Sequence, residues 1–257
     1  MLEKIKNKFK RKKIPYSKQN ISKKDIKKVI EVLKSDFITQ GPLINEFTNK
    51  IKTKVQSSYS IALNSATSAL HVAYKALGLG EGDYLWTSPN TFVATTNAAL
   101  LCGAKVDFID IDKDTYNLSI FELKKKLDTA KKQNKLPKIV TCVHFAGQSC
   151  SMEEIFKLSK IYNFKIVEDA SHAIGGSYKD ALIGNCRYSD ITVFSFHPVK
   201  IITTGDGGVA VTNDKLIAEK ISMLSSHGIV RNLNSHIENN EIWNYYQNDR
   251  TAFFAKA

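Results

Sequence analysis

Hydrophobic residues follow two different spacings along this chain. From residue 60 onward, short apolar runs alternate with segments whose apolar residues recur every three or four positions. The runs predict strands at 61–63, 84–87, 106–111, 139–143, 166–167, 191–194 and 209–211. The spaced segments predict helices at 66–77, 92–101, 121–132, 152–162 and 216–224. This alternation predicts an α/β fold, with a mostly parallel sheet sandwiched by helices.

Two further helices are predicted upstream of the first strand. Ser22-Lys23-Lys24-Asp25 resembles a capping box with Asp in place of Glu, and helically spaced apolar residues follow it at Ile26, Val29, Ile30 and Leu33. The stretch 35–42 breaks this pattern and predicts a loop. A second helix is predicted to begin near Pro42, because proline suits the first turn of a helix.

Ligands of such sheets bind beyond the carboxyl ends of the strands. That rule brings 64–67, Asp169 and Ser195 to one rim, and Lys200 follows between an apolar strand and the glycine-rich turn 205–208. A lysine and an aspartate at strand ends are what pyridoxal 5′-phosphate (PLP) requires. The lysine forms a Schiff base with the cofactor, and the aspartate keeps the pyridine nitrogen protonated.

Each member of this pair has a simpler alternative. Lys200 read as one more surface lysine fits poorly, because its setting is apolar: Phe194, Phe196, Pro198, Val199, Ile201 and Ile202. Asp169 alone could equally be the N-cap of a helix. His172 is either a structural histidine or, as we interpret it here, a support for the cofactor ring.

A phosphate site is predicted where Ser65-Ala66-Thr67-Ser68 opens a helix, because free N–H groups at a helix N-terminus bind anions. Ser195 could add a hydroxyl, and an ordinary helix cap is the alternative. Neither G-x-x-x-x-G-K-[ST] nor G-x-G-x-x-G occurs, which disfavours nucleoside triphosphate and dinucleotide sites. Phe92 is predicted either to stack on the cofactor ring or to be a core aromatic.

The net charge of +12 comes mostly from lysines, many of them in a basic extension at 1–13. Such a run predicts a solvated arm, and without a nucleic-acid motif we expect no nucleic-acid partner. No apolar run is long enough for a membrane span and no secretory signal is present, so we expect a cytoplasmic protein without a membrane partner. The four cysteines form no C-x-x-C pair, which predicts reduced thiols and no metal site.

Several motifs, in this order, resemble the DegT/DnrJ/EryC1/StrS sugar aminotransferases, which have the PLP-dependent transferase fold of type I. The matching segments are 14–17, 35–42, 64–71, 91–95, 168–173 and 195–200. The resemblance implies that Lys200 carries PLP and moves a proton as general acid and base. It also implies that L-glutamate donates an amino group to the 4-keto carbon of a UDP-linked 6-deoxy sugar, in pseudaminic acid biosynthesis.

The resemblance also assigns binding roles. Thr67, Ser68 and Ser195 would hold the cofactor phosphate, and Asp169 the ring nitrogen. The sugar pocket would be lined by Tyr16, Asp36, Phe37, Ile38, Thr39, Ala66 and Ser195. One departure lies next to the lysine, where Asp206 replaces the glutamate of a Thr-Thr-Gly-Glu-Gly-Gly stretch.

The resemblance predicts a large PLP-binding domain at 14–246, followed by an atypical tail at 247–257. Family members continue there into a smaller C-terminal domain, which helps complete the neighbouring site of a homodimer and would be largely missing here. The alternative function is therefore a truncated, non-catalytic remnant, or an interaction partner of a full-length subunit. A PLP-dependent dehydratase of the same fold would usually have histidine in place of Lys200, which argues against it.

Overall fold

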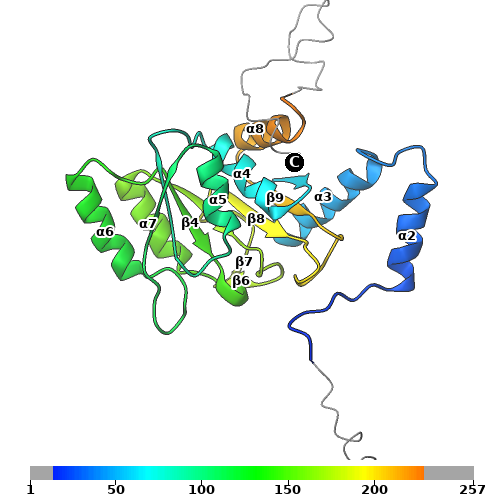
Figure 1. Ribbon diagram of the computed structural model, residues 1–257, viewed down its shortest axis with the longest axis horizontal. Helices are drawn as coiled ribbons and strands as arrows, with labels where there is room; N and C mark the ends of the chain where they lie inside the picture. The colour runs from blue at the N-terminus through cyan, green and yellow to red at the C-terminus, as the bar shows by residue number, and fades with distance from the viewer. Residues whose placement is uncertain (1–13, 229–257) are drawn as a thin grey trace, which may run out of the picture.

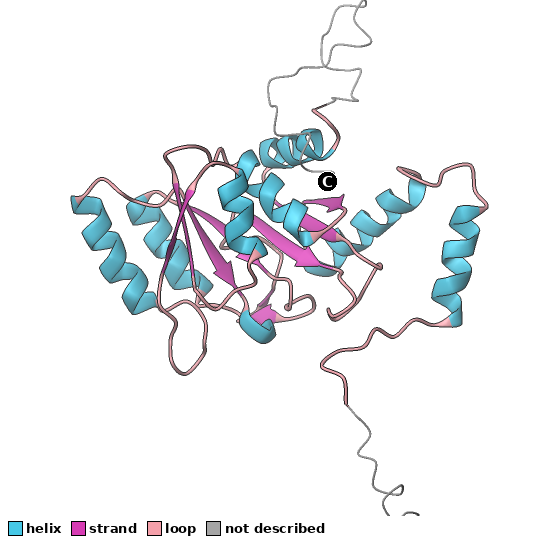
Figure 2. Ribbon diagram, in the orientation of Figure 1, coloured by secondary structure: helices cyan, strands magenta, loops and turns pink. Residues whose placement is uncertain are grey.

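The structure, a computed structural model, describes residues 14–228. The predicted extension at 1–13, the tail at 247–257 and the end of the predicted large domain at 229–246 lie outside the described residues. A seven-stranded sheet in the order β1-β9-β8-β5-β4-β2-β3 forms the centre, and helices cover both of its faces (Figures 1 and 2). No helix in the described range is long and apolar enough to cross a membrane.

The sheet is mostly parallel, as predicted. Its strands are β1 (Tyr59–Leu63), β2 (Tyr84–Thr87), β3 (Lys105–Phe108), β4 (Ile139–Val143), β5 (Lys165–Asp169), β8 (Ile191–Ser195) and β9 (Gly208–Thr212). Strands β3, β2, β4, β5 and β8 pair in parallel, whereas β9 runs antiparallel to both β8 and β1. Crossover helices explain the parallel part, because each one returns the chain to the same end of the sheet.

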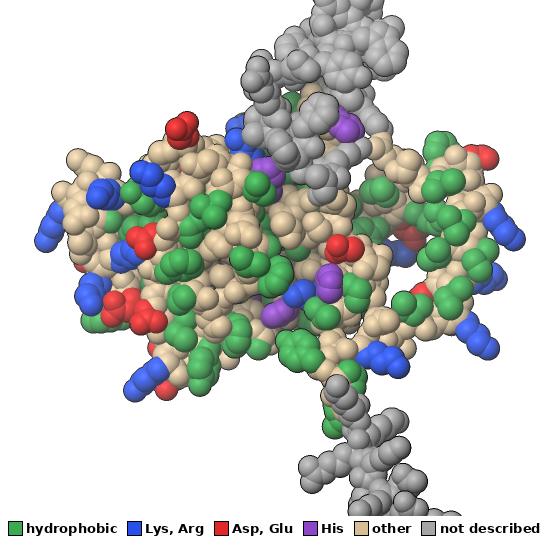
Figure 3. Space-filling model, in the orientation of Figure 1, with side chains coloured by type: hydrophobic (Ala, Val, Ile, Leu, Met, Phe, Trp, Pro, Cys, Tyr) green, Lys and Arg blue, Asp and Glu red, His purple; other side chains and the backbone are tan. Residues whose placement is uncertain are grey.

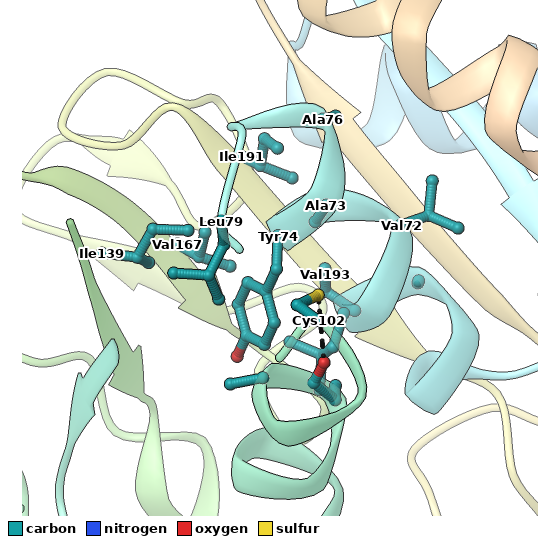
Figure 4. Packing of buried hydrophobic residues seen from close by; sticks show 14 of the residues in the cluster. Val72, Ala73, Tyr74, Ala76, Leu79, Cys102, Ile139, Val167, Ile191 and Val193 are labelled. Atoms are coloured by element: carbon teal, nitrogen blue, oxygen red, sulfur yellow. Dashed lines mark hydrogen bonds between the residues drawn. The ribbon is translucent and has the colours of Figure 1, made fainter. Parts of the chain in front are cut away.

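Successive strand residues are buried on opposite faces of the sheet. Val193 and Val167 pack beneath α4 (Ala66–Ala76), α5 (Ala94–Leu101) and α8 (Lys215–Ser225), where Tyr74 points into the cluster (Figure 4). On the other face, α6 (Ile120–Lys132) and α7 (Met152–Tyr162) cover Ile166, and α3 (Pro42–Val55) packs near Phe194. Burial on both faces explains why these strands appear in the sequence as continuous apolar runs.

Two differences from the sequence prediction have local causes. Strand β3 ends at Phe108 rather than at 111, because its neighbour β2 ends at Thr87. Ile109 N–H still donates to the Thr87 carbonyl, and Ile111 N–H then donates to the Asp110 side chain. The hairpin of β6 (Ser177–Tyr178) and β7 (Ala181–Leu182) was not predicted, because two residues per strand leave no detectable period.

The N-terminal arm, residues 14–41, contains α2 (Lys23–Leu33). The predicted capping box is present, since Asp25 N–H donates to Ser22 and Ser22 N–H donates to the Asp25 carboxylate. None of the α2 residues is buried, and α2 lies at one end of the molecule, beyond α3 (Figure 1). Helix α3 begins at Pro42, as predicted.

Candidate active site

Strand register brings the predicted rim residues together. Leu63, the last residue of β1, pairs with Gly208, and Gly208 pairs with Ser195 on β8. On the next strand, Asp169 pairs with Val193. The ends of β1, β8 and β5 therefore lie at the same edge of the sheet, with the start of β9 between β1 and β8, which confirms the predicted rim.

Lys200 lies in the loop between β8 and β9, residues 196–207, which we call the lysine loop. Its two ends are joined, because Phe196 N–H donates to the Gly207 carbonyl at 2.9 Å. Within the loop, Thr203 Oγ1 donates to the Phe196 carbonyl at 2.8 Å, and Lys200 N–H donates to the His197 carbonyl at 2.9 Å. These bonds join the loop to its own first residues, at the end of β8.

The predicted apolar setting of Lys200 is only partly correct. Phe194 and Phe196 are buried, but Val199, Ile201 and Ile202 are 44%, 61% and 48% exposed. The reason is that the chain leaves the sheet after β8, so the apolar residues of the loop beyond Phe196 no longer face a core. Lys200 itself is partly buried. Loss of hydration lowers its pKa, and the nearby Asp169 carboxylate opposes this shift.

His172 contacts the lysine directly, with 2.9 Å between its Nε2 and Lys200 Nζ. Loss of hydration, followed by the charge of Lys200, lowers the pKa of His172, and the charge of Asp169 opposes this shift. A neutral imidazole with its proton on Nδ1 accepts a hydrogen bond from the lysine ammonium. His172 is thus placed to hold the amine, a more specific position than the sequence predicted.

Asp169 ends β5 and is buried, as predicted. Its Oδ2 accepts a hydrogen bond from Thr95 Oγ1 at 2.8 Å, and its Oδ1 accepts from Ser171 Oγ at 2.6 Å and Ser171 N–H at 3.2 Å. A turn follows rather than a helix, so the N-cap alternative is wrong. Neither Thr95 nor Ser171 was predicted as a partner of Asp169. The sequence signals for them were the place of Ser171, two residues after the aspartate, and of Thr95, at the end of the segment 91–95.

Glu168, next to Asp169, points to the opposite face of the sheet. Its carboxylate accepts hydrogen bonds from His144 Nε2 at 2.7 Å, from Thr192 Oγ1 at 2.9 Å and from Ser189 Oγ. Cys150 N–H donates to His144 Nδ1, so the histidine proton lies on Nε2, towards Glu168. Burial alone would raise the pKa of Glu168, but these hydrogen bonds keep it below its ordinary value. Glu168 is fully engaged in this network and anchors β5 beneath the site.

The predicted phosphate site is a backbone cradle at the start of α4. Ser65 is the N-cap, and its Oγ accepts a hydrogen bond from Ser68 N–H at 3.1 Å. The predicted cap and the predicted anion site are compatible, because one N-cap bond leaves further first-turn N–H groups, such as those of Ala66 and Thr67, directed at a ligand.

Gly208 explains how closely the strand approaches this cradle. A Cβ at Gly208 would lie 2.3 Å from the Ser65 carbonyl oxygen and 2.5 Å from Ala66 N. Only glycine permits this approach. Because Gly208 pairs with Ser195, the approach also brings the buried Ser195 towards the cradle.

The remaining predicted residues lie at the surface. Phe92 is 71% exposed, so its alternative place in the core is wrong, and stacking on a ring stays a prediction. Tyr16 is 97% exposed, yet its neighbour Ser17 donates a hydrogen bond to the Val199 carbonyl at 3.2 Å, which ties the arm to the lysine loop.

The predicted sugar-binding segment Asp36–Thr39 lies in the exposed loop between α2 and α3, and Figure 1 places this loop beyond α3 and away from the strand ends. Its contact with a sugar stays a prediction. Asp206, whose side chain is shorter than that of glutamate, bonds to its neighbour in the chain: its Oδ1 accepts a hydrogen bond from Gly207 N–H at 2.8 Å.

The chemical groups of this site fit PLP. The site offers one amine, Lys200, for an aldehyde, one buried carboxylate, Asp169, for a protonated ring nitrogen, and a helix N-terminus for a phosphate. The close approach of Gly208 to Ser65 is the local observation that a phosphate cradle requires, because it leaves backbone and small hydroxyls at the rim.

Known proteins of similar sequence include a transaminase and a protein of polysaccharide biosynthesis. At 45% identity over 218 residues, the chain resembles the UDP-4-amino-4,6-dideoxy-N-acetyl-β-L-altrosamine transaminase of Campylobacter jejuni, covering 85% of this chain and 56% of that protein. It is 37% identical over 232 residues to the spore coat polysaccharide biosynthesis protein SpsC of Bacillus subtilis, covering 90% of this chain and 58% of that protein.

Solved structures agree. Helicobacter pylori PseC, an aminotransferase involved in the biosynthesis of pseudoaminic acid, has a TM-score of 0.79 and 34% identity, with 86% of this chain and 58% of that chain covered. The PLP-form of the putative sugar aminotransferase Spr1654 from Streptococcus pneumoniae has a TM-score of 0.75 and 28% identity, with 86% and 60% covered. The chain thus spans little more than half the length of these relatives.

The predicted fold class and cofactor are confirmed, since these neighbours are aminotransferases with a matching α/β architecture and one of them is a PLP form. The sequence profile of the DegT/DnrJ/EryC1/StrS aminotransferase family matches residues 19–246. With most of its length matched, this chain belongs to that family.

Proposed function

We propose that this chain binds PLP through Lys200 and supplies the large domain of an aminotransferase that acts on a nucleotide-linked keto sugar. The observation that carries this proposal is the contact of the Lys200 amine with His172 at 2.9 Å, beside the buried Asp169 and in the same rim as the helix cradle. The names of the relatives support the choice of a sugar as substrate.

Each residue has a separate task in this proposal. When bound, the cofactor supplies an electron sink for negative charge at the substrate carbon. Lys200 attaches the cofactor and afterwards moves a proton as general base and acid. His172 holds the Lys200 amine, and Asp169 keeps a negative charge at the ring nitrogen. The 65–68 segment binds the phosphate through its N–H groups and hydroxyls.

For the substrates, we propose L-glutamate as amino donor and the 4-keto carbon of a UDP-linked 6-deoxy sugar as acceptor, in pseudaminic acid biosynthesis. The C. jejuni relative acts on a UDP-linked amino sugar by its name, which supports this choice. Tyr16 and the loop 36–39 would contact the sugar. The hydrogen bond of Ser17 to the lysine loop supports the placement of Tyr16 near the site.

Borohydride trapping tests the attachment. Purified protein incubated with PLP should develop an absorbance near the visible edge, and borohydride followed by peptide mass mapping should find the adduct on Lys200. Lys200→Ala should abolish both signals. Lys220→Ala, an exposed lysine on α8, should keep them. An adduct on another lysine, or none in wild type, would refute the proposal.

The substrate choice is tested separately by half-reactions. Wild type loaded with PLP should convert L-glutamate to 2-oxoglutarate, and the aminated protein should then convert a UDP-linked 4-keto-6-deoxy sugar to its amino sugar. Turnover of glutamate without turnover of this sugar would leave the cofactor role intact and exclude the proposed acceptor.

A second candidate function is binding to another subunit. The partner would be a longer member of the same family, paired in the way that two copies pair in a homodimer. The apolar residues of α2 favour it, because Ile26, Val29, Ile30 and Leu33 are 51%, 59%, 46% and 62% exposed, and hydrophobic side chains gather on α2 in Figure 3. Size-exclusion chromatography with and without a full-length relative tests it. A monomer that catalyses the glutamate half-reaction alone would exclude a purely non-catalytic role.

A further inference from the structure

We infer that Thr95 is a positioning residue that aims the Asp169 carboxylate at the cofactor ring. The inference rests on the proposed cofactor role of Asp169. Thr95 lies on α5 and Asp169 at the end of β5, so the hydrogen bond of 2.8 Å between them joins two separate elements. The second donor, Ser171, comes from the turn that directly follows Asp169 and moves with it.

The Thr95 hydroxyl has a fixed direction. The residue is 0% exposed, and its Oγ1 lies 2.8 Å from Asp169 Oδ2 and 2.8 Å from Thr91 Oγ1. A hydroxyl has one proton to donate, and the ionised carboxylate can only accept. Thr95 therefore donates to Asp169, and Thr91 donates to Thr95, its nearer acceptor, with the Phe92 carbonyl at 3.3 Å as the more distant one.

The backbone of Thr95 is held as firmly as its side chain. Tyr74, fully buried on α4, donates its hydroxyl to the Thr95 carbonyl at 3.2 Å, and the Tyr74 hydroxyl accepts a hydrogen bond from Thr141 Oγ1 on β4 at 3.1 Å. Figure 4 shows Tyr74 within the core cluster beneath α4. Contacts from α4 and, through Tyr74, from β4 thus fix the backbone of Thr95, the residue on α5 that orients Asp169.

With both oxygens held, the plane of the carboxylate is set before a ligand arrives. Thr95 fixes Oδ2 and Ser171 fixes Oδ1, so the remaining lone pairs keep one direction. A preorganised carboxylate pairs with a pyridinium nitrogen without the cost of ordering the side chain. Thr91 precedes Phe92, so the same hydroxyl pair links the carboxylate to the segment predicted to cover the ring.

The test compares PLP with 1-deazapyridoxal 5′-phosphate, in which carbon replaces the ring nitrogen and offers nothing to a carboxylate. Thr95→Val keeps the volume and removes the donor, and Thr95→Ser keeps the donor. We expect Thr95→Val to weaken PLP binding by about tenfold or more, since a hydrogen bond to a charged group is lost. Binding of the deaza compound should be unchanged, and Thr95→Ser should bind PLP like wild type.

Controls separate this role from a structural one. Thr96→Val alters the next residue on α5, whose hydroxyl donates to the Val93 carbonyl instead, and should leave both affinities unchanged. Circular dichroism reports folding of each variant, and Thr95→Ala replaces Thr95→Val if the latter does not fold. Equal losses for both compounds, or no loss for PLP, would overturn the inference. A wild type that binds no PLP would overturn the proposed function itself.

Discussion

The body of the molecule and its N-terminal arm are stabilised in different ways. In the body, neighbouring residues of one strand such as Val193 and Phe194 are each fully buried, one against each face of the sheet. In the arm, α2 has a capping box and an apolar stripe, but none of its residues is buried. Short isolated helices are marginal in water, so α2 with its apolar stripe exposed should be less stable than the helices of the body.

This difference separates two parts of the proposed activity. Lys200, Asp169 and the cradle at Ser65 belong to the body, so their geometry depends on a core that this chain builds itself. Tyr16 and the predicted sugar loop 36–39 belong to the arm. We therefore expect cofactor binding to be more robust than sugar recognition in this chain.

The largest contrast should come from truncating one apolar residue in each region. Leu85→Ala on β2 removes a side chain that is 0% exposed and should lower the free energy of unfolding by about 2–5 kcal/mol. Ile30→Ala on α2, 46% exposed, should change it by less than about 0.5 kcal/mol. Urea unfolding measures both. A comparable loss for Ile30→Ala would mean that the arm is covered in solution.

A smaller effect is expected at the cradle. Gly208→Ala places a methyl group against the Ser65 carbonyl and should cost about 1–3 kcal/mol, as overpacking does. Gly80→Ala is the matched control, because its added Cβ would have no atom within 4 Å. Thermal melts of the two variants give the comparison. Equal melting temperatures would show that β9 and α4 do not approach as described.

Lowering the pH should reduce the free energy of unfolding of the body, because Glu168 becomes protonated. Hydrogen bonds from His144, Ser189 and Thr192 keep its pKa below the ordinary value of 4.5, so its contribution is complete above that pH and is lost as the pH falls through the folded-state pKa. Glu168→Gln should flatten this acid limb of the unfolding free energy. The measurement is urea unfolding between pH 3 and 6, and identical slopes in both proteins would contradict it.

The smallest effect is confined to the arm. Ser22→Ala removes the N-cap of α2, so amide hydrogens of α2 should exchange faster while those of β4 stay unchanged. Hydrogen exchange measured by NMR resolves the two regions. Unchanged exchange in α2 would mean that contacts outside this chain hold the helix.

Periodicity predicted every strand of the main sheet, because each strand lies between two helical layers and must be apolar. It failed for β6 and β7, whose two residues each are defined by pairing alone. It also misjudged the lysine loop, because local apolarity does not reveal that Val199 and Ile201 have left the sheet.

The site, too, could be predicted from the sequence only in part. Strand ends identified Asp169 and the cradle, since the rule for parallel sheets depends only on topology. The partners of Asp169 and Lys200 depend on distances between elements that lie far apart in the sequence. Thr95 and the His172–Lys200 contact could therefore be found only in three dimensions.

Strand β9 runs antiparallel to β8, and this determines how changes in the lysine loop affect the sheet. The lysine loop begins and ends on adjacent strands, with Ser195 paired to Gly208 at its base. Substitutions, insertions or movements in the middle of the loop should therefore leave the register of β8 and β9 unchanged. The loop around Lys200 can therefore vary in sequence while the pairing of β8 and β9 is kept, provided that it still brings the Lys200 amine to His172.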